Sequence, residues 1–124
     1  MIDHVSIEVS DLAVSTRFYE RLLKPLNMRI VKELPNTVGF GKKYPEFWIN
    51  LRKDMIKSAT ASGAHVCLRA RDIAAIDEFY RIALEFGGAD DGRPGPRPHY
   101  THNYYATFIR DPDGNRIEAV TFVE

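Results

Sequence analysis

The feature that most constrains this sequence is an internal repeat with an offset of 61 residues. Residues 4–11 read His-Val-Ser-Ile-Glu-Val-Ser-Asp, and residues 65–72 read His-Val-Cys-Leu-Arg-Ala-Arg-Asp. The same offset aligns Phe18-Tyr19 with Phe79-Tyr80 without a gap. A period of half the chain indicates duplication of one supersecondary unit, because a solenoid needs three or more copies.

Each copy begins with the pattern of a strand followed by a helix. Apolar and polar side chains alternate through residues 4–9 and 65–70, which is typical of a strand with one buried face. Asp11 and Asp72 follow, where a helix N-cap belongs, so we expect their carboxylates to accept hydrogen bonds from the first helical turn. Apolar residues at helical spacing come next in both copies.

The ends of the helices and the remaining strands are marked by turn residues. Pro25 is expected to end the first helix, and Gly87-Gly88 to end the second with a left-handed cap. Strand-like runs then cover residues 28–34, 37–41, 46–52, 104–110 and 115–122. A weaker alignment of Phe40 with Phe108 sets Asn50 opposite Glu118 and leaves the extra residues in a Gly/Pro-rich stretch.

The predicted architecture is therefore a β-α-β-β-β unit used twice in one α+β domain, residues 1–124. Module 1 spans approximately residues 1–56 and module 2 approximately residues 64–124, with Lys57–Gly63 as the connector. We expect the sheets to curve into a cup with the helices on the outer face. The open face, which carries His4 and His65, is then the working face.

The bulk composition indicates one globular domain whose charges balance. At 124 residues the chain can bury a core without metal or disulfide staples. Seventeen Lys and Arg balance seventeen Asp and Glu, so nothing favours nucleic acid or an anionic membrane as a partner. No apolar run has the length of a signal peptide or a membrane span, and the single Cys67 cannot form an internal disulfide. A reducing cytoplasm is the expected location.

Two short motifs, together with the repeat, resemble a known superfamily. They are Asp3-His-Val near the start and Asp111-Pro-Asp-Gly-Asn-Arg-Ile-Glu118 near the end. With the duplicated unit, they resemble the vicinal oxygen chelate superfamily, which contains glyoxalase I, the bleomycin-resistance proteins and the extradiol dioxygenases. The resemblance covers essentially the whole chain, and it implies a small-molecule site on the open face of the cup.

The resemblance also implies a metal site. In metal-binding members the ligands come from the first and last strands of each module, which correspond here to His4, Asn50, His65 and Glu118. Glyoxalase I has a carboxylate at the position of Asn50, so the remaining set is the two histidines and one glutamate used by extradiol dioxygenases. Such donors suit a divalent ion such as Fe, Mn, Ni or Zn. We therefore predict a metal bound by His4, His65 and Glu118.

Several of these residues also have a simpler interpretation. Glu118 lies in an otherwise apolar strand, where either a cation or a pairing with Arg69 or Arg116 would offset its desolvation; we favour the metal. Asn50 either ligates weakly or is hydrogen-bonded in the cavity wall. Cys67 shares a strand face with His65, but a free cysteine is commonly a small buried residue, and we do not count it as a ligand.

The substrate is expected to contact the open face and one proline-rich segment. Arg93–His102 is the least repeated part of the chain, and its prolines stiffen it. It is either a rigid lid that carries substrate contacts or a surface connection. The predicted substrate-binding residues are Asn50, Trp48, Arg69, His99 and Tyr100.

These expectations give two candidate functions. The first is a metal-dependent enzyme, either a lyase or isomerase or a dioxygenase, that acts on a small substrate whose adjacent oxygens chelate the ion. The second is a metal-free cup that binds a drug or metabolite, as in the bleomycin-resistance proteins. The metal content of the purified protein distinguishes them. Open sheet edges and the frequency of two-fold dimers predict a homodimer in either case.

Overall fold

The first module folds as predicted in the computed structural model, which describes residues 1–57 and 63–124. Asp11 caps the first helix, since its carboxylate accepts a hydrogen bond from the backbone N–H of Val14 (3.1 Å). The helix ends before Pro25, which lies within a separate 3₁₀ turn. The elements are β1 Val5–Val9, α1 Leu12–Leu22, η1 Lys24–Leu26, β2 Arg29–Leu34, β3 Thr37–Gly41 and β4 Phe47–Leu51.

The second module repeats this order. Asp72 caps its helix by accepting from the N–H of Ala75 (2.9 Å), and Gly87 follows the helix with a positive φ of 107°, as its sequence position predicted. The elements are β5 Val66–Arg69, α2 Ile73–Glu85, β6 Ala89–Pro96, β7 Tyr104–Arg110 and β8 Arg116–Phe122. The predicted connector between the modules lies mostly outside the described residues, since positions 58–62 are not among them.

The prediction for the proline-rich segment was partly wrong. Its first residues belong to β6, Ala89–Pro96, and not to a loop. Proline is tolerated there because β6 is the outer strand of its sheet, paired only with β7. The pairing shifts register on both sides of Gly92, so the strand is irregular. Its Gly and Pro residues are the reason why the sequence did not predict a strand here.

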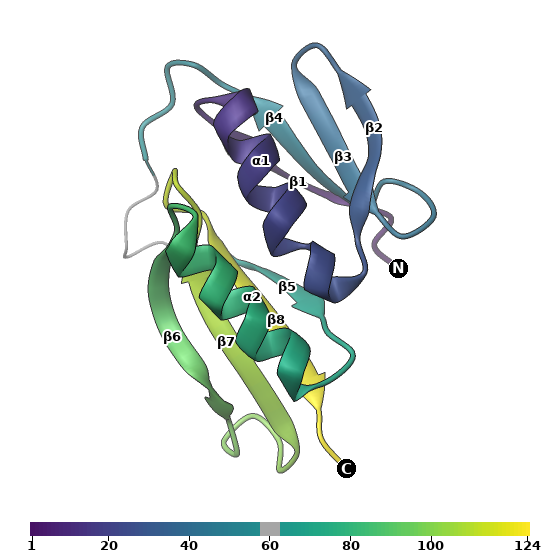
Figure 1. Cartoon of the computed structure of the whole chain (residues 1–124), viewed down its shortest axis with the longest axis vertical. Helices are drawn as coiled ribbons and strands as arrows, with labels where there is room; N and C mark the ends of the chain where they lie inside the picture. The colour runs from purple at the N-terminus through teal and green to yellow at the C-terminus, as the bar shows by residue number, and fades with distance from the viewer. Residues whose placement is uncertain (58–62) are drawn as a thin grey trace.

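Each module contributes one four-stranded sheet, and the two helices lie over one side of the sheets (Figure 1). The strand orders are β1-β4-β3-β2 and β5-β8-β7-β6. In each sheet the first and last strands of the module run parallel, and the other neighbours are antiparallel. These two curved βαβββ units confirm the predicted fold class. No helix in the described parts of the chain is long and apolar enough to cross a membrane.

Aromatic side chains fill the space between α1 and its sheet. Phe18, Tyr19, Phe40 and Phe47 are each at most 1% exposed, and burying a side chain of this size contributes about 1.5–3 kcal/mol. The Tyr19 ring contacts Phe18 and Phe47 at centroid distances of 5.1 Å. Its hydroxyl donates to the buried carboxylate of Asp111 in the second module (2.6 Å), so this core also joins the two modules.

The Asp-Pro-Asp-Gly-Asn turn at residues 111–115 clamps the second module onto the first. Asp113 accepts hydrogen bonds from the backbone N–H (3.0 Å) and the hydroxyl (2.5 Å) of Ser10. The side-chain amide of Asn115 donates to the carbonyl of Glu8 (2.9 Å). The sequence indicated only a turn between two strands. The structure gives its polar side chains a second role, because they hold the end of β1 against the base of β8.

Candidate functional site

The site is built around one histidine–glutamate pair on the second sheet. His65 directly precedes β5, and Glu118 lies in the middle of β8, the parallel neighbour of β5. His65 Nε2 lies 2.9 Å from Glu118 Oε1. The structure therefore brings together two of the three ligands predicted from the sequence. An imidazole nitrogen and a carboxylate oxygen at this separation can share a proton or, after a small rearrangement, a cation.

Glu118 is buried in an apolar strand, and its charge is stabilised by neighbours that the sequence did not identify. It is 3% exposed, and its second oxygen accepts a short hydrogen bond from the Tyr104 hydroxyl. The two arginines considered as partners have other contacts: Arg69 lies over the Phe122 ring (4.7 Å), and Arg116 pairs with Asp91 (2.7 Å). Two hydrogen bonds thus offset the desolvation of Glu118.

The groups beside Glu118 stay protonated. Burial, followed by the negative charge of Glu118, raises the pKa of the Cys67 thiol to about 12. Burial and the hydrogen bond to Glu118 also raise the pKa of the Tyr104 hydroxyl above its usual value. At neutral pH both groups are therefore protonated, and the Tyr104 hydroxyl donates a hydrogen bond to the carboxylate. Although its thiol is partly enclosed beside Glu118, the Cys67 residue as a whole is exposed on the open face, so the expectation of a small buried cysteine was wrong.

The third predicted ligand lies apart from this pair. The His4 side chain is 54% exposed, and its Nδ1 lies 2.7 Å from the Asp3 carboxylate. It lines a cavity of about 580 Å³ on the first sheet together with Trp48 and Asn50. Among the residues that the structure describes, no three His, Cys, Asp or Glu side chains gather closely enough to hold a metal ion.

Strand register shows how the two halves of the repeat correspond. Trp48 pairs with Ser6, just as Glu118 pairs with Cys67, and Ser6 and Cys67 are equivalent in the repeat. Trp48, and not Asn50, therefore occupies the position equivalent to Glu118. The weaker alignment drawn from the sequence was off by two residues in this strand.

The same misalignment affects the neighbouring strand. Phe40 pairs with Phe47 and is fully buried in the core, whereas Phe108 pairs with Glu118 on the open face. A register error of one residue exchanges the two faces of a strand, so aligning Phe40 with Phe108 was wrong. Asn50 is on the open face, as predicted, and its side-chain oxygen accepts a hydrogen bond from the Thr37 hydroxyl (2.5 Å).

A row of aromatic rings runs from the proline-rich segment to the carboxylate. The His99 ring packs at a tilt against Tyr100 (centroids 4.3 Å apart), and Tyr100 packs against Tyr104 (5.0 Å). Tyr100 also lines a cavity of about 410 Å³ together with His65. Of the predicted substrate contacts, Tyr100 therefore shares a cavity with His65, and His99 is connected to it through the Tyr100 ring.

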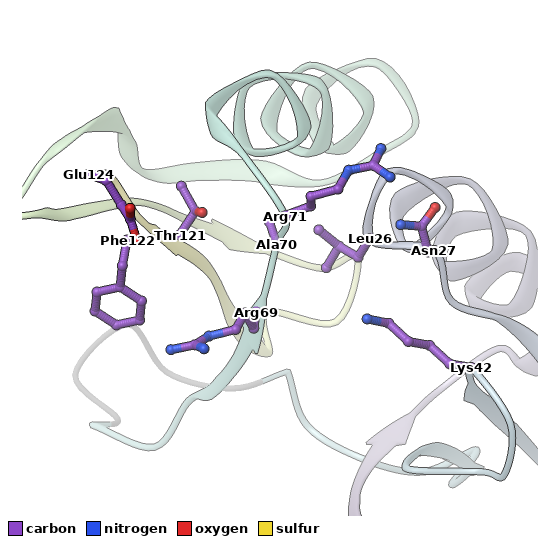
Figure 2. A pocket seen from close by; sticks show the side chains of 9 residues that line it. All are labelled: Leu26, Asn27, Lys42, Arg69, Ala70, Arg71, Thr121, Phe122 and Glu124. Carbon is purple, nitrogen blue, oxygen red and sulfur yellow. The ribbon is translucent and has the colours of Figure 1, made fainter.

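Arg69, another predicted substrate contact, faces a different cavity. This cavity, of about 450 Å³, lies where the two modules meet and is lined by residues of both, including Lys42 and Arg71. Figure 2 shows Lys42 entering from the first module, while the guanidinium of Arg69 turns toward Phe122. Arg69 is not among the residues that line the two cavities beside His65.

Known proteins are similar to this chain in sequence and in fold. Residues 1–119 match the family model described as the Glyoxalase/Bleomycin resistance protein/Dioxygenase superfamily. The chain is 28% identical to "Virulence protein STM3117" of Salmonella typhimurium strain LT2, over 98% of this chain and 84% of that protein.

Solved structures agree in fold. A glyoxalase/bleomycin resistance protein from Albidiferax ferrireducens T118 superposes with a TM-score of 0.82 at 27% identity, over 95% of this chain and 96% of that one. Glyoxalase I from Zea mays gives a TM-score of 0.73 at 22% identity, over 95% of this chain and 44% of that one. The family model covers residues 1–119, and the two βαβββ modules agree with the solved relatives, so the chain belongs to the Glyoxalase/Bleomycin resistance protein/Dioxygenase superfamily.

Proposed function

We propose that this protein is a metal-dependent enzyme that acts on a small substrate with adjacent oxygens. The observation that supports this most is the His65–Glu118 pair. A buried carboxylate lies 2.9 Å from an imidazole that lines two cavities. Two donors of this kind are half of an ordinary site for Fe, Mn, Ni or Zn.

Within one chain, the predicted ligands fit a metal only in part. His65 and Glu118 are neighbours, whereas His4 lies on the other sheet and is exposed. We propose that the site is completed in a two-fold homodimer, where His4 of one copy joins His65 and Glu118 of the other. A two-fold axis would form two such sites at once, because each copy carries both halves. Light scattering should then give twice the chain mass of 14.2 kDa.

The bound ion would act as a Lewis acid toward the adjacent oxygens of the substrate. The chain's own residues have distinct tasks around it. Tyr104 holds the Glu118 carboxylate through its hydroxyl, and the Phe108 ring packs against His65 (centroids 5.6 Å apart), limiting its rotation. The residues proposed to contact the substrate are Trp48, Asn50, Arg69, His99 and Tyr100. The position in which these residues hold the substrate would decide between a lyase, an isomerase and a dioxygenase reaction.

A second function has its own supporting observation. Both oxygens of Glu118 already have hydrogen-bond partners in Tyr104 and His65, so the carboxylate is stabilised without an ion. The alternative is a metal-free protein that binds a small molecule or drug on the same open face. Here His65 and Glu118 would be hydrogen-bonding groups of the pocket wall.

Metal stoichiometry separates the two functions. The protein is purified without chelator, and Co²⁺, Mn²⁺, Ni²⁺ and Zn²⁺ are titrated against the wild type and three variants. We expect one ion per chain in the wild type, and a large loss of affinity in His65→Ala and Glu118→Gln. His102→Ala removes a histidine outside the site and should bind like the wild type. Absence of a stoichiometric ion in the wild type would contradict the enzyme proposal and favour the metal-free alternative. Equal binding by all four proteins would show that His65 and Glu118 are not the ligands.

A further inference from the structure

One basic side chain near His65 is fixed by backbone carbonyls and has no acidic partner. The Arg97 guanidinium donates to the carbonyls of Arg93 (2.8 Å), Gly95 (2.9 Å) and Pro96 (3.4 Å). In the part of the chain that the structure describes, no carboxylate forms an ion pair with it. The side chain is therefore ordered in advance, while its charge is not neutralised.

The backbone around Arg97 leaves room for the guanidinium. Gly92 has a φ of +150°, and a Cβ at this position would lie 3.2 Å from the Phe108 side chain and 3.5 Å from Arg97 Nη2. A Cβ on Gly95 would lie 3.4 Å from Arg97 Nη1. Larger residues at these two positions would crowd the space that the charge occupies. The glycines and the ring of Phe108 thus form a cradle for one cation.

This cradle adjoins the proposed metal pair. The guanidinium carbon of Arg97 lies 5.9 Å from the centroid of the Phe108 ring, and the His65 ring contacts the same ring. Both side chains line the cavity of about 410 Å³ that Tyr100 also lines, a size that suits a small metabolite. Asp91, the acid in its wall, is paired with Arg116.

We propose that Arg97 binds the carboxylate or phosphate of an anionic substrate, whose other end reaches His65 and Glu118. This inference rests on the proposed function and names its substrate class. The three carbonyl bonds use at most three of the five guanidinium N–H groups, so at least two remain for a ligand. A planar guanidinium binds such oxyanions through paired hydrogen bonds. Because Arg97 is already ordered, binding costs little side-chain entropy.

The test titrates metal-free protein at low ionic strength with succinate, inorganic phosphate and the neutral succinamide. Backbone amide and histidine-ring NMR signals report where each compound binds. We expect at least one anion, and not succinamide, to shift the signals of Gly92, Gly95 and His65. The relative affinities of succinate and phosphate show whether Arg97 prefers a carboxylate or a phosphate.

Matched variants assign the effect to Arg97. Arg97→Gln should weaken anion affinity about tenfold, the effect of losing one charge-assisted interaction. Arg93→Gln removes the same charge from the same segment and should change affinity less than about twofold, as for an exposed charge. Arg97→Lys keeps the charge without the planar fork, and it should bind between the wild type and Arg97→Gln if its spectrum is folded.

Three results would overturn the proposal. The first is equal weakening by Arg97→Gln and Arg93→Gln, and the second is no response of the wild type to either anion. The third is a set of shifts confined to Asn27 and Lys42, which line the other cavity (Figure 2). Because the titration contains no metal, its failure leaves the metal proposal standing. Failure to bind metal would likewise leave the anion site in place.

Discussion

Trp48 holds in the first module the strand position that Glu118 holds in the second. Trp48 is paired with Ser6 on β1, and Glu118 with Cys67, the repeat equivalent of Ser6, on β5. The duplicated unit thus places an aromatic ring at this position in one copy and a carboxylate in the other. At this position the first module can therefore supply a side chain that faces the substrate. The second module supplies the two proposed metal ligands, His65 and Glu118.

This relationship predicts which substitution adds a fourth ligand. Trp48→Glu places a carboxylate in the register that Glu118 occupies, and we expect it to raise divalent-metal affinity by about tenfold or more. Asn50→Glu should have a smaller effect, because position 50 lies farther along β4, opposite Glu8, and contacts Thr37. Competition with a chelator measures both variants. A larger gain for Asn50→Glu would contradict the register assignment.

Tyr104 is expected to act as a positioning residue for Glu118. Tyr104→Phe removes the hydroxyl that donates to the carboxylate, and we expect metal affinity to fall about 10- to 100-fold, as for other partners of metal ligands. Tyr105→Phe is the matched control. That hydroxyl donates to the Asp77 side chain on α2 (3.0 Å), away from Glu118. Equal affinities in the two variants would show that Tyr104 does not orient the ligand.

The hydrogen bond between Tyr19 and Asp111 should make the free energy of unfolding fall at alkaline pH. Burial raises the pKa of the Tyr19 hydroxyl well above 10, with the Asp111 charge as the next cause. A group whose folded pKa is raised contributes stability that is complete below its unfolded pKa and is lost as the pH rises toward the folded pKa. The relevant window therefore begins near pH 10 and extends upward.

Tyr19→Phe tests this coupling. At pH 7 the variant should lose about 1–3 kcal/mol of unfolding free energy, since the buried Asp111 carboxylate loses a donor. Between pH 7 and pH 11 the wild type should lose about 1.4 kcal/mol more than the variant, because only the wild-type unfolded state can ionise this hydroxyl. Urea unfolding at both pH values gives the difference. Parallel pH dependence of the two proteins would contradict the assignment.

The sequence predicted those features of the fold that depend on local pattern. Strand alternation and the aspartates before each helix were enough to place both β-α starts, and Asp11 and Asp72 are N-caps as expected. Strand β6 was missed, because Gly and Pro in an outer strand are indistinguishable from a loop until the register with β7 is known. Local pattern also could not show that Phe40 and Phe108 lie on opposite faces of their sheets.

The candidate site was predictable only where the repeat carried the information. His65 and Glu118 were identified from the repeat and the resemblance, and the structure places them in contact. Tyr104 was missed, since its hydroxyl reaches along the sheet to a carboxylate that is not its cross-strand partner. Arg97 was covered only as part of the stiff segment Arg93–His102. Its value as an anion site depends on three carbonyls whose positions no sequence pattern specifies.

In the proposed metal site, His4 of one copy joins His65 and Glu118 of another. Mixed dimers test it, using chains that carry His4→Ala, His65→Ala or Glu118→Gln with two different affinity tags. A mixed dimer of His4→Ala and His65→Ala contains one intact site and one that lacks both histidines. A mixed dimer of His65→Ala and Glu118→Gln contains no intact site, because both changes lie in the same half.

The decisive measurement is the metal content of these mixed dimers at an ion concentration that saturates the wild type. We predict one tightly bound ion in the His4→Ala and His65→Ala mixed dimer, and none in the His65→Ala and Glu118→Gln mixed dimer or in any of the three variant homodimers. Equal metal content in the two mixed dimers, or full metal content in the His4→Ala homodimer, would contradict the shared site.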